Sequence, residues 1–447
     1  MIIEFATAAA LVYGYNYLKD SETRKIKKKW EETLQACKAD GIKNKNDETF
    51  KITGIFKRKY GYWCNVTIPR GCSTSALIKA KDILQDNLNC LIEFEKERFK
   101  DYISVKIINK LLQFEYAPVK TKSNELFLGY KLDCSQYIID LNKDPHVLIA
   151  GKTGTGKSFL FATILTNLIY HNKKEIDIYL LQKMKGEIDI FKNCPSVKFT
   201  SDNPSEILVI LKKLTDIIHK RSKQFAACGI KNINQWNKNF PNKKMKRIII
   251  GAEEISFFME PGSKDEANPF FHYFNDIVKA GRSAGVHFIG LIQRTTAANL
   301  GGNGELKSQL TVITAKQRSE LDSRNAIDIN DAAYLESQEF ICSCNDGYVT
   351  FKAPTIDEDF MILNKYVPEI KVPEVEVKEK PQVGKKSRIL SIEETAKLRE
   401  NYVCMPLQEY QNLEENKVAS LQQNNILPVG TRRPGAVKVG VNNGADR

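Results

Sequence analysis

The segment GKTGTGKS at residues 151–158 constrains the fold more than any other feature of the chain. It matches the pattern G-x-x-x-x-G-K-[ST] and lies between the apolar run HVLIA, residues 146–150, and a helical pattern. Such a loop points backbone N–H groups at phosphate oxygens, and the following helix adds its positive N-terminal end. We therefore predict a site for ATP and Mg²⁺, with Lys157 on the β and γ phosphates and Ser158 on the metal. The predicted nucleotide-binding residues are Gly151, Lys152, Thr153, Gly154, Thr155, Gly156, Lys157 and Ser158.

Two carboxylates follow another apolar run, RIIIGA at residues 247–252. A P-loop needs one acidic side chain at the end of a neighbouring strand to organise the metal, and a second one to accept a proton from the attacking water. Glu253 is predicted to take the first role and Glu254 the second. Gln293, at the end of VHFIGLIQ, is predicted to sense the γ phosphate, and His287 in the same run is predicted to pack in the core.

Apolar runs alternate with longer helical patterns between residues 126 and 355. This alternation is typical of a parallel sheet covered by helices on both faces. Residues 50–118 mix short strand-like runs with one helical stretch, which predicts a small α+β domain. We expect an α/β protein in which this small domain precedes a RecA-like P-loop domain with a mainly parallel sheet over residues 119–366. The strands expected in that sheet are residues 146–150, 176–182, 247–252, 286–293 and 310–315.

The N-terminus carries an apolar stretch of about 17 residues, near the lower limit for crossing a bilayer as a helix. Tyrosines lie at its C-terminal end and a basic run follows it. We predict a transmembrane anchor over residues 1–18, a basic juxtamembrane segment over 19–49, and a cytoplasmic P-loop domain. The chain would then be a single-pass protein of the cell membrane. Glu4 weakens this prediction, and an amphipathic or buried N-terminal helix is the alternative.

The chain of 447 residues has a formal net charge of +13, which attracts polyanions such as nucleic acid or anionic lipid. Charge alone does not distinguish these two partners. The ten cysteines include no C-x-x-C pair, which argues against a zinc site and for dispersed reduced thiols. Residues 367–447 begin with a stretch rich in proline and charge and are predicted to form a linker and a C-terminal tail.

Four segments together resemble the motor domain of the FtsK/SpoIIIE family of DNA translocases. Residues 126–160 lead into the P-loop, and residues 217–237 resemble a helix of the family with a glycine turn. KAGRSAGVHFIGLIQRT at 279–295 contains the Gly-Arg-x-Ala-Gly-x-His pattern, and SELDSRNAID at 319–328 contains the Asp-Ser-Arg pattern. The segments occur in the order that the family has.

The chain departs from the family pattern at two positions near the P-loop. Glu253 stands where the family usually has Asp, and the segment from Gln182 to Glu187 replaces an Asp-Pro-Lys motif. The longer side chain of Glu253 keeps the charge but extends the carboxylate by one methylene. No recognisable winged-helix module follows the motor, so reading of chromosomal orientation sequences is not expected.

The resemblance implies an ATPase that couples hydrolysis to DNA translocation, assembled as a homo-hexameric ring. In such a ring one subunit's arginine completes the next subunit's site, and Arg282 and Arg324 are the candidates. Either arginine could instead be a surface or ion-paired residue. The compact chain resembles the coupling proteins of conjugative elements, with a relaxase and transfer-channel proteins as expected partners. A chromosome or plasmid partition pump and a nucleotide-switched membrane scaffold are the alternatives.

The segment RTTAANLGGNGELK, residues 294–307, leaves the run that ends in Gln293. A loop there can respond to the γ phosphate, and its hydroxyls, amides and backbone N–H groups suit contacts with DNA phosphates that read no sequence. Thr295, Thr296 and Asn299 are the predicted DNA-binding residues. A flexible surface turn is the alternative interpretation.

Overall fold

The chain divides into two units, Met1–Pro373 and Glu374–Arg447. The computed structural model describes residues 21–182, 188–258, 269–295, 304–345 and 347–373, and the backbone of two short strands of the second unit. These strands, β15 (Val403–Pro406) and β16 (Ile426–Val429), pair in parallel. Within the described ranges no helix is both long and apolar enough to cross a membrane. The predicted anchor at residues 1–18 lies outside them.

The small domain combines a four-stranded antiparallel sheet, in the order β1-β2-β4-β3, with helices. Trp30 and Leu34, from a helix over residues 21–36, are fully buried in the same core as Phe50 and Leu77. This is the predicted α+β architecture, and its packed core begins before residue 50. Its elements are β1 (Lys51–Arg58), β2 (Gly61–Thr67), α2 (Thr74–Lys79), α3 (Lys81–Leu88), β3 (Leu91–Glu95) and β4 (Tyr102–Ile108).

The P-loop domain contains a ten-stranded sheet in the order β6-β5-β14-β13-β12-β7-β11-β10-β8-β9. Neighbours from β12 to β9 pair in parallel, and those from β6 to β12 pair antiparallel. The sheet is therefore mixed, and the prediction of a mainly parallel sheet holds only for one side of it. The reason is that short turns join β5 to β6 and β13 to β14, and such turns can connect only antiparallel strands.

All five strands predicted for this domain are present, with ends that differ by no more than one residue. They are β7 (His146–Ala150), β8 (Ile176–Leu181), β10 (Arg247–Ala252), β11 (Val286–Ile292) and β12 (Thr311–Thr314). The sheet is completed by β5 (Glu125–Lys131), β6 (Gln136–Asp140), β9 (Val197–Ser201), β13 (Glu339–Cys344) and β14 (Gly347–Lys352).

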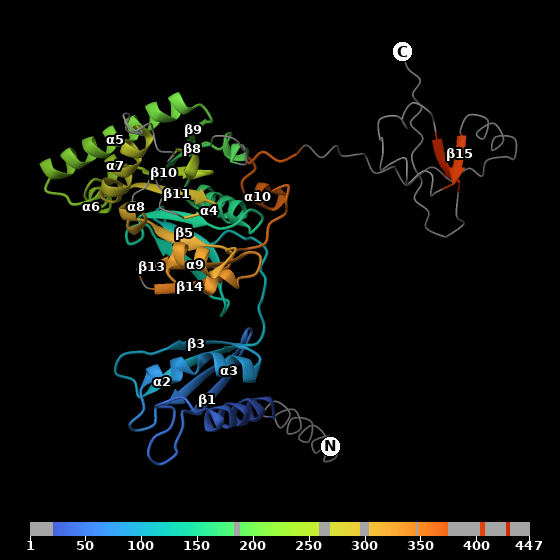
Figure 1. Cartoon of the computed structure of the whole chain (residues 1–447). Helices are drawn as coiled ribbons and strands as arrows, with labels where there is room; N and C mark the ends of the chain where they lie inside the picture. Colours follow the sequence, from blue (N-terminus) through green and yellow to red (C-terminus); the bar gives the residue numbers. More distant parts are fainter. Residues whose placement is uncertain are drawn as a thin grey trace, which may run out of the picture. The chain divides into compact units, whose positions relative to one another are not determined.

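Alternate side chains of β7 enter two separate hydrophobic cores, one on each face of the sheet. Val147 and Ile149 lie in the core that contains α4 (Lys157–Asn172), whereas Leu148 and Ala150 lie in the core beneath α5 (Pro204–Ala227) and α7 (Pro269–Ala284). Figure 1 shows α5 and α7 side by side, as their packing against each other requires. Burial on both faces explains why these strands are apolar along their whole length.

The first and last parts of the P-loop domain meet at one edge of the fold. The N–H of Tyr116 donates to the carbonyl of Thr355 at 3.0 Å, and the N–H of Thr355 donates to the carbonyl of Phe114 at 2.8 Å. A parallel β-bridge joins Glu115 to Thr355 at the same place. The domain is thus closed by its own two ends.

Buried polar side chains mark the N-terminal ends of the parallel strands. His287 is fully buried; its Nδ1–H donates to the carbonyl of Pro145 at 3.0 Å, and its Nε2 accepts from Arg247 at 2.8 Å. The contact with Arg247 requires the neutral ring, because a protonated Nε2 cannot accept, and burial together with the charge of Arg247 holds the pKa of His287 well below its usual value. His287 is thus a core residue, as its position in an apolar strand predicted.

Candidate active site

The parallel strands place the P-loop, both glutamates and Gln293 at the C-terminal edge of the sheet. The loop is a continuation of β7: the N–H of Gly151 donates to Ile292 of β11 at 3.2 Å. Gly151 has φ +147°, and a Cβ there would lie 2.8 Å from the Cβ of Ala315. Gly156, with φ +94°, is the N-cap residue of α4. Only glycine fits such backbone angles and close approaches without strain, so these glycines set the path of the loop.

Lys157 begins α4 and is 9% exposed. Its Nζ donates to the carbonyl of Gly151 at 2.6 Å and to that of Lys152 at 2.9 Å. The Thr155 hydroxyl also donates to the Lys152 carbonyl, at 2.7 Å. The ammonium group is therefore held over the loop, where it is placed to meet phosphate oxygens. Ser158 follows it in the first turn of the helix and lines the same cavity.

The two glutamates extend from the end of β10 into the same space. The N–H of Glu253 continues the β10–β8 ladder by donating to Leu181 at 3.1 Å, which fixes the point where the chain leaves the sheet. Glu253 is 2% exposed and Glu254 is 4% exposed. The Ser256 hydroxyl donates to Oε1 of Glu254 at 2.7 Å and orients that carboxylate. The two carboxylates therefore lie where the sequence predicted, facing the P-loop.

One cavity of about 510 Å³ joins these groups, because Gly154, Lys157, Ser158, Glu253 and Glu254 all line it. This volume is in the range of ligand-binding pockets. The part of the chain that the structure describes has no cluster of three His, Cys, Asp or Glu side chains that could hold a metal by itself. Mg²⁺ is usually bound by one or two carboxylates together with substrate phosphates, and Glu253 and Glu254 bring two carboxylates to this cavity.

The residues therefore fit ATP with Mg²⁺. Lys157 and the loop N–H groups would hold the phosphates, and the Ser158 hydroxyl and Glu253 would hold the metal. A bound Mg²⁺ would neutralise charge on the β and γ phosphates. Glu254, held by Ser256, is placed as the base that accepts a proton from water.

The far wall of the cavity comes from residues that sequence reasoning missed. Ser337 and Gln338, just before β13, and Glu358 and Phe360, just before α10 (Met361–Tyr366), line it together with Phe159. The rings of Phe159 and Phe360 meet edge to face with centroids 5.9 Å apart. An aromatic and polar wall beside a P-loop suits a nucleotide base. Positive φ angles at Gln338 (63°) and Phe360 (59°) place these residues, and the sequence carries no motif for them.

Gln293 lies on another side of the P-loop than the glutamates. It is exposed and lines a second cavity, of about 340 Å³, together with Lys152, Thr153, Arg294 and Arg318. It therefore lies beside the P-loop but does not line the cavity that contains Glu253 and Glu254. At the end of β8, Gln182 is buried, and its Nε2 donates to Asp189 at 2.8 Å. This contact stands where the family has its Asp-Pro-Lys motif.

The structure does not bring either candidate arginine to the P-loop of its own chain. Arg282 and Arg324 are both exposed, and neither lines the nucleotide cavity. Arg282 precedes β11, at the opposite edge of the sheet from the P-loop.

Of the predicted DNA-binding residues, Thr295 is 7% exposed. Thr296 and Asn299 lie outside the described residues.

A strand leading into a glycine-rich loop and helix, with two acids on a neighbouring strand, defines this domain as a P-loop ATPase of the RecA type. The family comparison is more specific. Residues 110–321 match the model of the FtsK/SpoIIIE family. The predicted resemblance is confirmed.

Curated relatives that are named DNA translocase FtsK are similar to the chain. The relative from Caldanaerobacter subterraneus is 26% identical over 219 residues, which cover 47% of this chain and 30% of the relative. The relative from Helicobacter pylori strain 26695 is 24% identical over 335 residues, which cover 70% of this chain and 38% of the relative. The chain thus spans about a third of the length of these relatives.

Among solved structures, the monomer form of the pCW3 conjugation coupling protein TcpA with ATPγS has a similar fold. The two share 22% identity and a TM-score of 0.54, over 78% of this chain and 100% of that one. At this level of identity the likeness establishes the fold. It covers more of the chain than the family model does.

Proposed function

We propose that this protein is a membrane-anchored, ATP-dependent DNA translocase that acts as a coupling protein in conjugative DNA transfer. The observation that carries the ATP-dependent part is the single cavity shared by Lys157, Ser158, Glu253 and Glu254. A protein that uses nucleotide binding only as a switch can dispense with a water-activating carboxylate, so the buried position of Glu254 favours an ATPase over a nucleotide-switched scaffold.

DNA as the substrate is supported by the FtsK/SpoIIIE domain and by the net charge of +13. The conjugative role is supported by the fold shared with a protein named as a conjugation coupling protein. The names of the curated relatives, DNA translocase FtsK, keep a partition pump as the second candidate. The proposed assembly is a homo-hexamer in which Arg282 or Arg324 reaches the neighbour's nucleotide. A relaxase and transfer-channel proteins are the proposed partners.

The test is ATP hydrolysis with and without duplex or single-stranded DNA, in the full chain and in Lys157→Ala. We expect DNA to stimulate hydrolysis in the natural protein. We expect Lys157→Ala to lose ATP binding or turnover while it stays folded, because the phosphates lose their main point charge. Folding is checked by circular dichroism. DNA-stimulated hydrolysis that is unchanged in Lys157→Ala would rule out the assignment.

A further inference from the structure

A continuous stretch of the P-loop domain is basic and contains no acid. Between residues 217 and 252 the sequence has nine Lys and Arg residues and no Asp or Glu. The stretch covers the second half of α5, the short helix α6 (Ile233–Asn239) and β10. It lies at the N-terminal edge of the parallel strands, away from the P-loop. None of these nine cations lines the nucleotide cavity.

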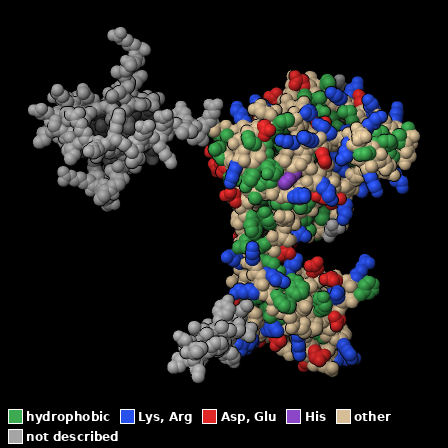
Figure 2. Space-filling model, turned by 180° about the vertical axis from the view of Figure 1, so that it is seen from behind, with side chains coloured by type: hydrophobic (Ala, Val, Ile, Leu, Met, Phe, Trp, Pro, Cys, Tyr) green, Lys and Arg blue, Asp and Glu red, His purple; other side chains and the backbone are tan. Residues whose placement is uncertain are grey.

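Three of these nine cations have structural partners. Lys246 pairs with Asp177 at 3.0 Å, Arg221 donates to the carbonyls of Ala284 and Lys246, and Arg247 is buried. The other six are exposed, and the structure gives their side chains no ion pair within the described ranges. Figure 2 shows that Lys and Arg side chains are spread over the visible face. The six are Lys220, Lys223, Lys231, Lys238, Lys243 and Lys244.

A groove of about 460 Å³ lies at this edge. Its cationic lining residues are Lys231, before α6, and Lys279 and Arg282 of α7. Its polar lining includes Asn142, Asn234 and Ser222, and none of its lining residues is acidic. Cations from the loop before α6 and from α7 therefore line one concavity together with amides and hydroxyls.

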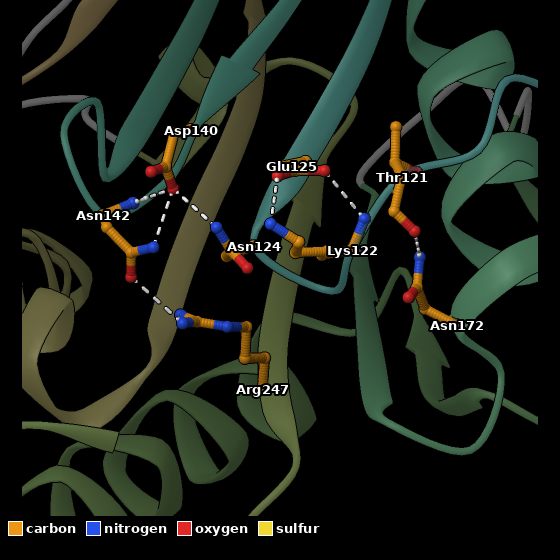
Figure 3. Close-up of polar contacts among 8 residues, drawn as sticks. All are labelled: Thr121, Lys122, Asn124, Glu125, Asp140, Asn142, Asn172 and Arg247. Atoms are coloured by element: carbon orange, nitrogen blue, oxygen red, sulfur yellow. Dashed lines mark hydrogen bonds and ion pairs between the residues drawn. The ribbon is translucent and has the colours of Figure 1, made fainter. Parts of the chain in front are cut away.

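The buried guanidinium of Arg247 holds two amides of the groove in place, and Figure 3 shows its contact with one of them, Asn142. Arg247, only 3% exposed, donates to Oδ1 of Asn142 at 3.0 Å and also to Oδ1 of Asn234. Asn142 in turn donates through Nδ2 to Asp140 at 2.8 Å. Both amide oxygens are thus occupied, and each NH₂ group makes one of its two possible bonds. What the asparagines can offer a ligand is N–H donors. The carboxylates of Asp140 and Glu175 offset part of the charge of Arg247, so its role here is to fix the two amides.

We propose that this groove, which we call the Lys231 groove, is a second DNA-binding site of the domain and holds backbone phosphates. Cations with amide and hydroxyl donors are the groups that contact phosphate oxygens without reading sequence. The groove precedes β11, so it lies roughly 20 Å, the length of a seven-residue strand, from the end of that strand at Ile292. The inference rests on the proposed function for the identity of the polyanion.

The groove favours DNA over a membrane surface. Peripheral membrane segments insert apolar side chains next to their cations. No large hydrophobic side chain between residues 217 and 252 is exposed in the structure. An acidic face on a second copy of the chain is a further possible occupant, and the experiment distinguishes it from DNA.

The experiment measures the affinity of the full chain for a labelled random-sequence duplex, without nucleotide, over a series of salt concentrations. We expect Lys231→Glu to raise Kd about fivefold and to reduce the slope of log K against log salt by about 1, the effect of losing one phosphate contact. Arg282→Gln should act in the same direction. Lys213→Glu is the matched control, because Lys213 is exposed on α5 outside the groove and the charge change is identical.

Three results would overturn the proposal. In the first, Lys231→Glu and Arg282→Gln both bind DNA as the natural chain does. In the second, Lys213→Glu weakens binding as much as Lys231→Glu does, which shows only general charge. In the third, DNA binding is kept, but self-association by sedimentation or binding to anionic phospholipid vesicles is lost. Because ATP is absent, a failure here leaves the ATPase test of the proposed function unaffected. Basal ATPase of Lys231→Glu should equal that of the natural chain.

Discussion

At the scale of single residues, Glu253 and Glu254 are adjacent and both buried, yet replacing each of them is expected to have a different effect on the ATPase reaction. Glu254→Gln should bind ATP within about twofold of the natural protein but hydrolyse it at least 100-fold more slowly, because an amide cannot accept the proton of the attacking water. Glu253→Gln should instead raise the Mg²⁺ concentration needed for activity. Equilibrium nucleotide binding and steady-state hydrolysis measure the two effects. If Glu253→Gln trapped ATP while Glu254→Gln turned over normally, the two roles would be reversed.

A substitution at Phe360 tests whether the cavity wall that no motif predicted binds the nucleotide base. Phe360→Ala removes a ring that packs on Phe159, so we expect ATP binding to weaken about tenfold through loss of apolar contact with the base. Binding of inorganic triphosphate should not change, because the P-loop is intact. Met361→Ala is the control, since Met361 is the next residue, is exposed and does not line the cavity. Equal weakening of ATP and triphosphate binding would contradict a base site.

The sequence predicted the site residues unevenly, for a physical reason. Lys157, Ser158, Glu253 and Glu254 lie at the ends of strands whose apolar runs are visible in the sequence, so their convergence follows from parallel pairing. Gln338 and Phe360 reach the cavity through turns with positive φ at non-glycine residues. Such turns are stabilised by tertiary contacts and leave no pattern in the chain. The side of the P-loop on which Gln293 lies was likewise not predictable from its position at a strand end.

At the scale of elements, the N-terminal ends of β7 and β11 hold two neutral histidines in the core. Burial lowers the pKa of His146 to about 3, and the pKa of His287 is also well below 6.5. Below about pH 6.5 the two histidines are protonated in the unfolded chain but not in the folded chain. Their contribution to the free energy of unfolding is therefore complete above pH 6.5 and is lost as the pH falls toward 3. At pH 5.5 the expected loss is about 1.4 kcal/mol per histidine.

His287→Gln isolates half of this effect, because Gln can still accept from Arg247 but cannot be protonated. We expect the fall in unfolding free energy between pH 7 and pH 5.5 to be smaller in the variant by about 1.4 kcal/mol. Urea denaturation at the two pH values measures this difference. Comparing the decrease between pH 7 and pH 5.5 in the two proteins cancels any loss of stability that the substitution causes at both pH values. The same fall in both proteins would show that His287 is protonated in the folded state.

In the mixed sheet, the sequence predicted most of the parallel strands but not the antiparallel ones. Five of the six parallel strands could be identified because each is a run of apolar residues next to a helical pattern; the sixth, β9, has the mixed sequence VKFTS and was not predicted. The antiparallel strands β5, β6, β13 and β14 carry mixed sequences such as QYIID and GYVTFK, and the position of β14 beside β5 depends on residues more than 200 apart. Pairing over such a separation is set by packing in the finished core and not by local pattern.

At the scale of the whole molecule, membrane attachment is tested by removing residues 1–18. The truncated protein should no longer be found in the membrane fraction. It should keep its ATPase activity, because residues 1–18 lie outside the P-loop domain. Cell fractionation and hydrolysis assays on the same preparation measure both properties. The same truncation with an unrelated single-pass anchor fused in its place is the control and should return to the membrane. Tight membrane binding that persists after deletion would remove the anchor proposal.

The bridge between Glu115 and Thr355 has a consequence for how this domain can be built into other chains. A domain whose entry and exit points are neighbours behaves as a cassette: it can be inserted into a longer polypeptide without forcing the host's two flanks apart. Flanking units can then be lengthened, shortened or exchanged while the catalytic unit keeps its shape. This geometry is compatible with similarity to relatives about three times as long as the matched region, and a transplanted domain must extend past Thr355 to keep Glu358 and Phe360, which line the nucleotide cavity.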